Sequence, residues 1–357
     1  MYPFSKDVYA AKNCWYVASF SRDVTRSPLE RWLLDQPVVL YRRENGEVVA
    51  LEGRCAHRHF PLAEGKVIGD NLQCPYHGFT YAPDGQAVRI PSQERPSSRC
   101  GIKSYPTVEK WRWIWIWMGD PVLADPGLIP DHYAIGLEGD DLTTDDAYHG
   151  EIEARYQLIH DNLMDLTHVA FLHRNTLGGG GDDSATAKVS EREGEGWLEA
   201  ERIIRDVPTV PHFAAYLGYA GNCDRHIGQR FYLPALHHGW DKYLYPEGHP
   251  EAGKMFGMLQ VYHAITPARR NSAHYFFATA RNFGREAHEE MRAATIAVIQ
   301  EDVWGLCHVE RMLQACHGNV PREYSARTDT QQLLARRKLE QLILRENEAL
   351  CEERIME

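Results

Sequence analysis

The sequence predicts an α+β fold, in which a β-rich N-terminal part precedes a part that packs a curved antiparallel sheet against helices. Three observations lead to this prediction. The stretch at 37–53 contains two strand-like runs joined by Asn45-Gly46, a strong hairpin signal. The aromatic run WRWIWIWMG at 111–119 has the length and composition of a buried strand. From residue 288 to the C-terminus the pattern is helical and amphipathic.

The remaining elements follow in order along the chain. A second hairpin is predicted around Asp84-Gly85, and the Pro/Gly-rich stretch at 119–131 indicates a domain boundary. We therefore expect one domain at 1–125 and another at 126–357. Further segments are assigned by their periodicity or composition: a helix in YQLIHDNLMDLTHVAFLH (156–173), a mobile loop around the four glycines at 178–181, and strands at 254–266 and 272–283.

Composition excludes several classes of protein. A chain of 357 residues with 43% hydrophobic and 25% charged residues is typical of globular proteins with one large or several smaller domains. The net charge of −11 argues against non-specific nucleic-acid binding, which depends on clustered Lys and Arg. The N-terminus shows no basic segment followed by an apolar core. We therefore expect a cytoplasmic protein whose eight cysteines are thiols or metal ligands.

Two pairs of potential metal ligands lie close together in the N-terminal part. Cys55 and His57 form Cys-x-His, and after sixteen intervening residues Cys74 and His77 form Cys-x-x-His. Such a set can hold a structural zinc ion, or a Rieske [2Fe-2S] cluster in which two Cys bind one iron and two His the other. Structural zinc sites usually place both sulfurs in one pair, whereas each pair here has one sulfur and one imidazole. The spacing therefore favours the cluster, and a zinc-stabilised small-molecule binding protein stays open as the alternative.

A second candidate metal site lies in the helix-like segment, which contains Asp165, His168 and His173. Two imidazoles and one carboxylate form the facial triad that leaves positions open on Fe(II) for O2. However, His168 and His173 are five residues apart, about 140° around an ideal helix. Both can bind one metal only if the helix breaks or bulges between them. The alternative is that both histidines simply belong to an amphipathic helix.

The motifs CAH, CPYHGFTY and NLMD-x-x-H-x4-H together resemble those of the Rieske non-haem iron oxygenases, oxygenase component. The likeness is greatest to the vanillate and dicamba O-demethylase group, through THVAFLHRN and the stretch at 263–284. It implies a Rieske domain at 1–125 and a catalytic domain of helix-grip, START-like type at 126–357. It also implies that Cys55 and Cys74 bind one iron, and that His57 and His77 bind the other.

The same resemblance implies roles for residues of the second domain. His168 and His173 would bind the mononuclear iron, and the third ligand would be Asp302 rather than its neighbour Glu301. Asp165 would be a bridge that carries electrons from His77 to His168, His263 would contact a substrate carboxylate, and Ala293 would lie at a position that lines the pocket. The alternative for His263 is a strand histidine satisfied by the backbone. Independently of the resemblance, Asn162 is interpreted either as an amide near the iron or as a polar residue on the helix surface.

The implied activity is O2-dependent oxidation of an aromatic substrate, with carboxylated or methoxylated aromatics favoured. O-demethylation with release of formaldehyde is the preferred reaction, and hydroxylation or dihydroxylation of a ring or methyl group is the alternative. The four glycines do not form a dinucleotide fingerprint, because they follow a helix. NAD(P)H electrons would therefore arrive through a separate reductase, with or without a ferredoxin, and would cross between subunits of a homotrimer. No function is predicted for Cys14, Cys100, Cys223, Cys307, Cys316 and Cys351.

Overall fold

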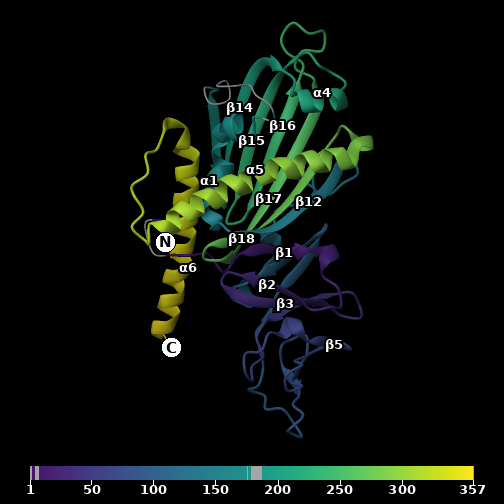
Figure 1. Ribbon diagram of the computed structural model, residues 1–357, viewed down its shortest axis with the longest axis vertical. Coiled ribbons are helices and arrows are strands. Elements are labelled where there is room, and N and C mark those ends of the chain that lie inside the picture. The colour runs from purple at the N-terminus through teal and green to yellow at the C-terminus, as the bar shows by residue number, and fades with distance from the viewer. Residues whose placement is uncertain (1, 5–7, 175, 178–186, 357) are drawn as a thin grey trace. The chain divides into compact units, whose positions relative to one another are not determined.

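The computed structural model in Figure 1 describes residues 2–4, 8–174, 176–177 and 187–356, without the side chains at 211, 212 and 349–356. The chain separates into two compact units. The smaller unit comprises Ala10–Ile129 and Thr266–Arg270, and the larger unit comprises Met1–Tyr9, Pro130–Ile265 and Asn271–Glu357. The glycines at 178–181, predicted to form a loop, lie outside the described residues.

The smaller unit is an all-antiparallel β structure. Its strands are β1 (Trp15–Phe20), β2 (Leu29–Leu33), β3 (Gln36–Arg42), β4 (Val48–Glu52), β5 (Lys66–Ile68), β6 (Asn71–Gln73), β7 (Thr80–Tyr81), β8 (Ala87–Arg89), β9 (Ser104–Tyr105), β10 (Thr107–Lys110) and β11 (Trp113–Trp117). Among the described residues they form three sheets, with strand orders β1-β11-β10, β2-β3-β4-β9 and β5-β6-β7-β8. This arrangement confirms the β-rich, antiparallel character that the sequence predicts.

The predicted turns and the aromatic strand are confirmed in detail. Gly46, between the paired strands β3 and β4, has φ +89°, a left-handed conformation that glycine adopts without strain. Gly85, between β7 and β8, has φ +87°, and a Cβ atom there would lie 2.1 Å from the carbonyl oxygen of Ile102. Only glycine fits that turn. The aromatic run forms β11, all five residues of which are buried.

The larger unit contains a seven-stranded sheet with the order β12-β18-β17-β16-β15-β14-β13. Its strands are β12 (Thr143–Ile152), β13 (Val189–Gly194), β14 (Trp197–Pro208), β15 (Asn222–Tyr232), β16 (Leu236–Leu244), β17 (Met255–Arg269) and β18 (Ser272–Arg281). Strands β13 to β17 pair antiparallel in chain order, and β12 pairs antiparallel with β18. The strands predicted at 254–266 and 272–283 are β17 and β18, so those predictions are confirmed.

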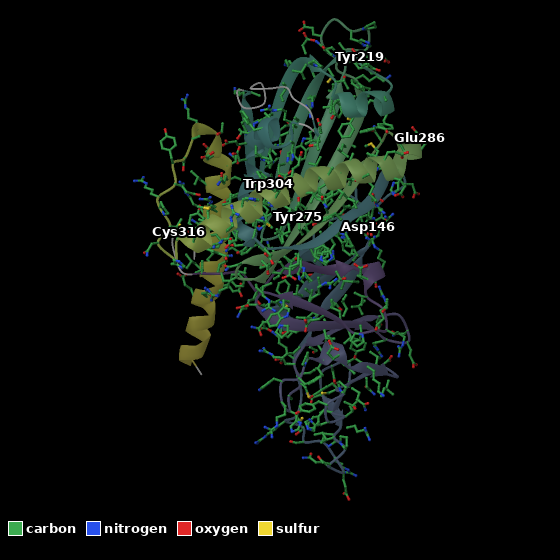
Figure 2. The ribbon with its side chains drawn as sticks, viewed as in Figure 1. Asp146, Tyr219, Tyr275, Glu286, Trp304 and Cys316 are labelled. Carbon is green, nitrogen blue, oxygen red and sulfur yellow. The ribbon has the colours of Figure 1, made fainter. Side chains whose placement is uncertain are left out.

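The helices of this unit are α1 (Tyr156–Met164), α2 (Val169–Leu172), α4 (Pro211–Leu217), α5 (His288–Ala315) and α6 (Thr330–Met356). Figure 1 shows α5 running across the sheet, and Figure 2 follows it from near Glu286 past Trp304 to Cys316. Ile299, Asp302 and Leu306 recur at intervals of three and four residues on α5, and all are buried. Asp302 thus lies on the buried face of this helix, as does a second acid, Glu310. No described helix is both long and apolar enough to cross a bilayer.

The helix predicted at 156–173 is broken, but not where we expected. Helix α1 ends at Met164, Asp165 is extended (φ −111°, ψ +92°), and a 3-10 turn at Leu166–His168 leads into α2. The break therefore precedes His168 instead of separating it from His173, which directly follows the last residue of α2. The cause is local, because the Asp165 carboxylate accepts a hydrogen bond from the main-chain N–H of Thr167 and so caps the new turn.

A buried ion pair ties the start of α1 to α5. The guanidinium of Arg155 donates to both carboxylate oxygens of Glu310, at 2.6 and 2.7 Å, and Glu310 is 1% exposed. Burial alone would raise the pKa of Glu310, but the hydrogen bonds from the side chain and main chain of Arg155 outweigh it and lower the pKa. Breaking such a pair leaves a charge buried, so this contact fixes the helix that carries Asp302.

Candidate metal centres and substrate cavity

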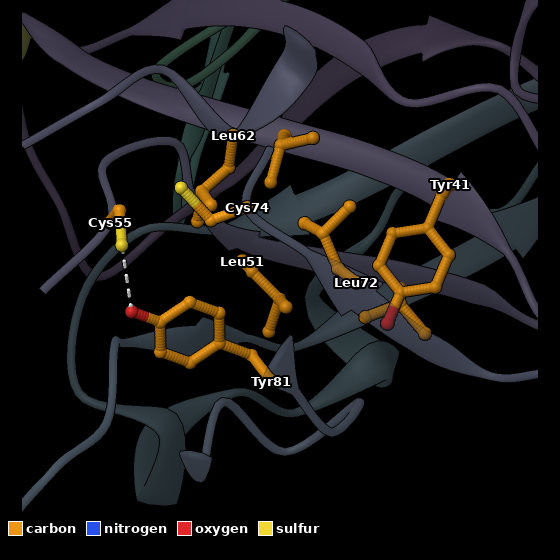
Figure 3. Packing of buried hydrophobic residues seen from close by; sticks show 9 residues of the cluster. Tyr41, Leu51, Cys55, Leu62, Leu72, Cys74 and Tyr81 are labelled. Carbon is orange, nitrogen blue, oxygen red and sulfur yellow. Dashed lines mark hydrogen bonds between the residues drawn. The ribbon is translucent and has the colours of Figure 1, made fainter. Parts of the chain in front are cut away.

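The four predicted cluster ligands lie on two similar loops of the smaller unit. The first follows β4, where the N–H of Cys55 donates to the Phe60 carbonyl at 2.9 Å. The second follows β6, where the N–H of Cys74 donates to the Phe79 carbonyl at 2.8 Å. Figure 3 shows both cysteines in the apolar core of this unit. The thiols are thus buried at the base of their loops.

The two imidazoles of the same loops are exposed and lie close to each other. The ring centroids of His57 and His77 are 4.5 Å apart, and His57 also stacks on Phe79 at 4.8 Å. Partial desolvation, followed by the nearby His77 and Arg58, lowers the pKa of His57 and favours the neutral imidazole that binds metal. Two buried thiols next to two exposed imidazoles match the donor set of a Rieske [2Fe-2S] cluster.

Hydrogen-bond donors converge on the two sulfurs. The hydroxyl of Tyr81 lies 3.1 Å from Cys55 Sγ, the contact drawn as a dashed line in Figure 3. Burial raises the pKa of Cys74, while the main-chain N–H groups of Tyr76 and His77 act in the opposite direction. Such donors stabilise sulfur that carries negative charge, so the pocket fits thiolates bound to iron.

The larger unit brings together the three residues predicted to bind the mononuclear iron. His168, His173 and Asp302 each offer one ligand atom, and these atoms lie within 4.8 Å of one another. Asp302 Oδ1 is 3.1 Å from Nε2 of His173 and 3.5 Å from Nε2 of His168. His173 and Asp302 are buried, with 2% and 7% exposed. Two imidazoles and a carboxylate in this arrangement fit a facial Fe(II) site.

Both imidazoles are oriented through their other ring nitrogen. Nδ1 of His168 donates to the main-chain carbonyl of Asp165 at 2.5 Å, and Nδ1 of His173 donates to Oε2 of Glu301 at 2.8 Å. The hydroxyl of Thr176 donates to the same carboxylate oxygen at 2.6 Å. Each Nε2 lone pair is therefore free to face a metal. Glu301 therefore contacts Nδ1 of His173, on the side away from the candidate metal position, and Asp302 lies near Nε2, on the side that faces it.

Electrostatics at these histidines favours a cation. Burial lowers the pKa of His168. Burial would also lower the pKa of His173, but hydrogen bonds and charges from Asp302 and Glu301 outweigh it, and the net shift is upward. Two carboxylates thus create a negative potential around a buried imidazole, and a divalent metal ion would neutralise it.

Asn162 and Asp165 lie next to this site. The Asn162 amide donates to Oδ1 of Asp302 at 2.9 Å, so it contacts one of the candidate iron ligands. Asp165, the residue expected to bridge to His168, contacts the His168 ring through its main-chain carbonyl and not through its carboxylate. The carboxylate instead accepts hydrogen bonds from the N–H and hydroxyl of Thr167, at 3.0 and 2.7 Å, because it caps the 3-10 turn.

A cavity of about 670 Å³ opens onto the three candidate iron ligands. It is of the size that holds small organic ligands, and most of its described lining is apolar. His263 lines it, but burial lowers the pKa of His263 to about 3, so this side chain is neutral. Our expectation for Ala293 is wrong. The turn of α5 leaves Ala293 exposed and directs its neighbour Ala294 into the cavity.

Two polar residues of the cavity wall escaped the sequence analysis. Arg202 of β14 and Gln229 of β15 each have 4% of their surface exposed. The available signal was strand alternation, because Arg202 shares a strand face with Ala200 and Ile204, both buried. A charged residue in such a position indicates a function or a buried partner.

Known protein families match both units of the chain. Residues 14–106 match the Rieske [2Fe-2S] domain family, and residues 152–345 match the family of the vanillate O-demethylase oxygenase C-terminal domain. The chain belongs to the Rieske non-haem iron oxygenases. This membership confirms the predicted class of oxidoreductase, with a Rieske [2Fe-2S] cluster and a mononuclear iron as cofactors. It favours the cluster over the zinc alternative.

Individual relatives of this Rieske oxygenase cover most of its length. It is 37% identical to the toluene-4-sulfonate monooxygenase iron-sulfur subunit TsaM1 of Comamonas testosteroni, over 82% of this chain and 85% of the relative. It is 34% identical to the dicamba O-demethylase oxygenase component of Stenotrophomonas maltophilia, over 76% and 79%. The crystal structure of dicamba monooxygenase bound to 3,6-dichlorosalicylic acid matches with a TM-score of 0.84, 32% identity, and coverage of 94% and 98%. As an oxygenase component, the chain works with separate proteins that supply electrons.

Proposed function

We propose that this Rieske oxygenase oxidises a carboxylated or sulfonated aromatic compound, preferably by O-demethylation of a methoxy group. The observation that carries the proposal is the convergence of His168, His173 and Asp302 on an apolar cavity of about 670 Å³. An aromatic ring in that cavity lies next to the candidate iron ligands and away from bulk water.

The proposal assigns each metal group to residues of the chain. Cys55 and Cys74, with His57 and His77, would hold the cluster, and His168, His173 and Asp302 would hold Fe(II). When bound, these groups supply electron transfer and O2 activation. Around them, Asn162 fixes the Asp302 carboxylate and Glu301 fixes the His173 ring. The apolar walls exclude water and position the substrate carbon.

O-demethylation needs little further chemistry from the protein. Two electrons and two protons are consumed with O2. One oxygen atom is inserted into a C–H bond of the methoxy group, and the other leaves as water. The resulting hemiacetal breaks its bond to the aryl oxygen and releases formaldehyde and a phenol. The described cavity lining contains no cysteine, serine or lysine, and this reaction requires no nucleophile from the protein.

Hydroxylation of a ring or methyl group is the second candidate. The relative TsaM1 is named after toluene-4-sulfonate, a compound that has a methyl group and no methoxy group. The same iron ligands serve either reaction, and the carbon that the cavity presents decides between them. Dihydroxylation of the ring belongs to the same alternative.

Other features of the protein are part of the proposal. We assign the Rieske domain to 1–125 and the catalytic domain to 126–357, in agreement with the two matched families at 14–106 and 152–345. A cytoplasmic homotrimer would receive NAD(P)H electrons through a reductase, and Asp165 would help electrons reach His168 from His77 of a neighbouring subunit. The resemblance to the family supports these assignments.

A single-turnover experiment tests the function without knowledge of the reductase. Iron-loaded protein is reduced with dithionite, freed of excess reductant and exposed to O2 with methoxybenzoates, methoxybenzenesulfonates or 4-methylbenzenesulfonate. We expect at least one methoxylated compound to yield formaldehyde and a phenol in equal amounts. Asp302→Ala, reduced in the same way, serves as the control that lacks the third ligand. Alcohol or ring-hydroxylated products without formaldehyde would establish the second candidate, and O2 uptake without any oxidised aromatic would refute both.

A further inference from the structure

The cavity contains a buried positive charge that the proposed chemistry at the metals does not use. Arg202 lies on the inner face of β14, where Leu198, Ala200 and Ile204 are its buried neighbours at alternate positions. Arg202 lines the same cavity as His168, His173 and Asp302. Only 4% of the residue is exposed.

Arg202 has no hydrogen bond or ion pair within the described part of the chain. Arg225, the other arginine of the cavity wall, is neutralised by Asp241, whose two oxygens lie 3.2 and 2.6 Å from its nitrogens. For Arg202, burial lowers the pKa, and the Asp165 carboxylate opposes this only through its charge. A guanidinium stays protonated in proteins, so the charge remains and requires a partner.

A second unpartnered donor lies beside it. Gln229 is 4% exposed, lines the cavity, and its Nε2 has no hydrogen-bond partner among the described residues. In the sheet, Arg202 pairs with Ile227 and Ala200 pairs with Gln229. Arg202 and Gln229 are therefore diagonal neighbours on one face of the sheet, a separation that long side chains can span. A buried donor without an acceptor is costly, so such a pair indicates a site for a ligand.

We propose that Arg202, assisted by Gln229, binds the anionic group of the aromatic substrate, a carboxylate or a sulfonate. This inference rests on the proposed function and adds to it the residues that recognise the charge of the substrate. The planar guanidinium can donate two parallel hydrogen bonds to either anion. The ring would then lie against Trp240, Val261 and Phe277, which also line the cavity. His263 contributes at most a neutral N–H donor, so the preference for an anionic over a neutral substrate comes from Arg202.

Binding measurements on the iron-loaded protein test the proposal. The probes are 4-methoxybenzoate, 4-methoxybenzenesulfonate and 4-methylbenzenesulfonate, with neutral 4-methoxybenzamide as the comparison. Calorimetry measures the Kd of each compound. We expect wild-type protein to bind at least one anion about 10- to 100-fold more tightly than the amide, the range of a charged hydrogen bond. Arg202→Met should abolish this preference and leave the amide Kd within about threefold, whereas Arg202→Lys should keep part of it. An unchanged preference in Arg202→Met, or none in the wild type, would overturn the proposal.

Control variants show whether a change in affinity is specific to the charge of Arg202. Arg205→Met alters an exposed arginine on the same strand and should leave all affinities unchanged. The visible spectrum of the cluster and circular dichroism report whether each variant folds, and Arg202→Gln provides a second neutral variant. If turnover falls in Arg202→Met while every Kd is unchanged, Arg202 acts on Asp165 and not on the substrate. Arg202-dependent anion binding without any turnover would retain the anion site and refute the proposed function instead.

Discussion

Glu301 accepts a hydrogen bond from Nδ1 of His173 at 2.8 Å, while the next residue, Asp302, lies 3.1 Å from Nε2 of the same ring. Two adjacent acids on α5 therefore contact opposite sides of one imidazole. The arrangement predicts different results when each acid is changed.

Asp302→Ala should lose the mononuclear iron and retain the cluster, because it removes one of the three proposed iron ligands. Glu301→Gln should retain iron but bind it roughly 10- to 100-fold more weakly, the usual effect of changing a group that orients a metal-bound histidine. Iron analysis should therefore find about three irons per chain in the wild type, two in Asp302→Ala, and three in Glu301→Gln at saturating Fe(II). Loss of the third iron only in Glu301→Gln would reverse the assignment.

Asp165→Asn should retain both metal groups while turnover collapses. The amide can still cap the 3-10 turn through its carbonyl oxygen, so the local fold should persist. It removes the negative charge proposed to help electrons reach His168. Steady-state O2 uptake, together with iron content and the reduced-cluster EPR signal, checks this prediction. Turnover near the wild-type value, with both metals bound, would show that Asp165 does not carry electrons.

Tyr81→Phe should lower the reduction potential of the cluster. The Tyr81 hydroxyl lies 3.1 Å from Cys55 Sγ, and a donor to sulfur stabilises the more negative, reduced state. The loss of one hydrogen bond, about 1 kcal/mol, corresponds to a decrease on the order of 40 mV for one electron. Redox titration of the visible spectrum measures the potential. A potential that stays unchanged or rises would contradict the role of this hydroxyl.

The His238→Gln variant should resist acid better than the wild type. Burial lowers the pKa of His238 to about 4, against the hydrogen bond between its Nε2 and Oε1 of Gln260 at 2.7 Å. In the unfolded chain the pKa is about 6.5, so the unfolded state binds more protons below that value, and stability falls as the pH decreases from 6.5 towards 4. Between pH 6.5 and 5 this side chain alone costs the wild type about 1.5 kcal/mol.

Glutamine can still donate to Gln260 but cannot become charged. Urea unfolding of both proteins at pH 6.5 and pH 5 should show that difference, because all other titrating groups are shared. The matched change His308→Gln, at an exposed position of α5, should lose as much unfolding free energy between pH 6.5 and pH 5 as the wild type loses. Equal losses in His238→Gln and in the wild type would show that His238 is not held neutral.

Local patterns accounted for much of the fold and for one complete donor set. The hairpin at Asn45-Gly46, the buried strand at 113–117 and the amphipathic helix at 288–315 were predictable, because turn chemistry and side-chain periodicity act over a few residues. The break near His168 was misplaced, since the side chain of Asp165 ends α1 by a hydrogen bond that periodicity does not register. The exposure of Ala293 likewise depends on how α5 rotates against the sheet.

The sequence by itself indicated Cys55, His57, Cys74 and His77 as the proposed cluster ligands, because short loops bring residues two or three positions apart onto one site. It indicated His168 and His173 in the same way, and Asp302 through the resemblance. Only the tertiary structure decided which ring nitrogen each carboxylate faces and that Arg202 and Gln229 line one cavity together with the candidate iron ligands. The reason is that these contacts join strands and a helix that are remote in sequence, and their side chains meet only when the sheet pairs and α5 packs across it.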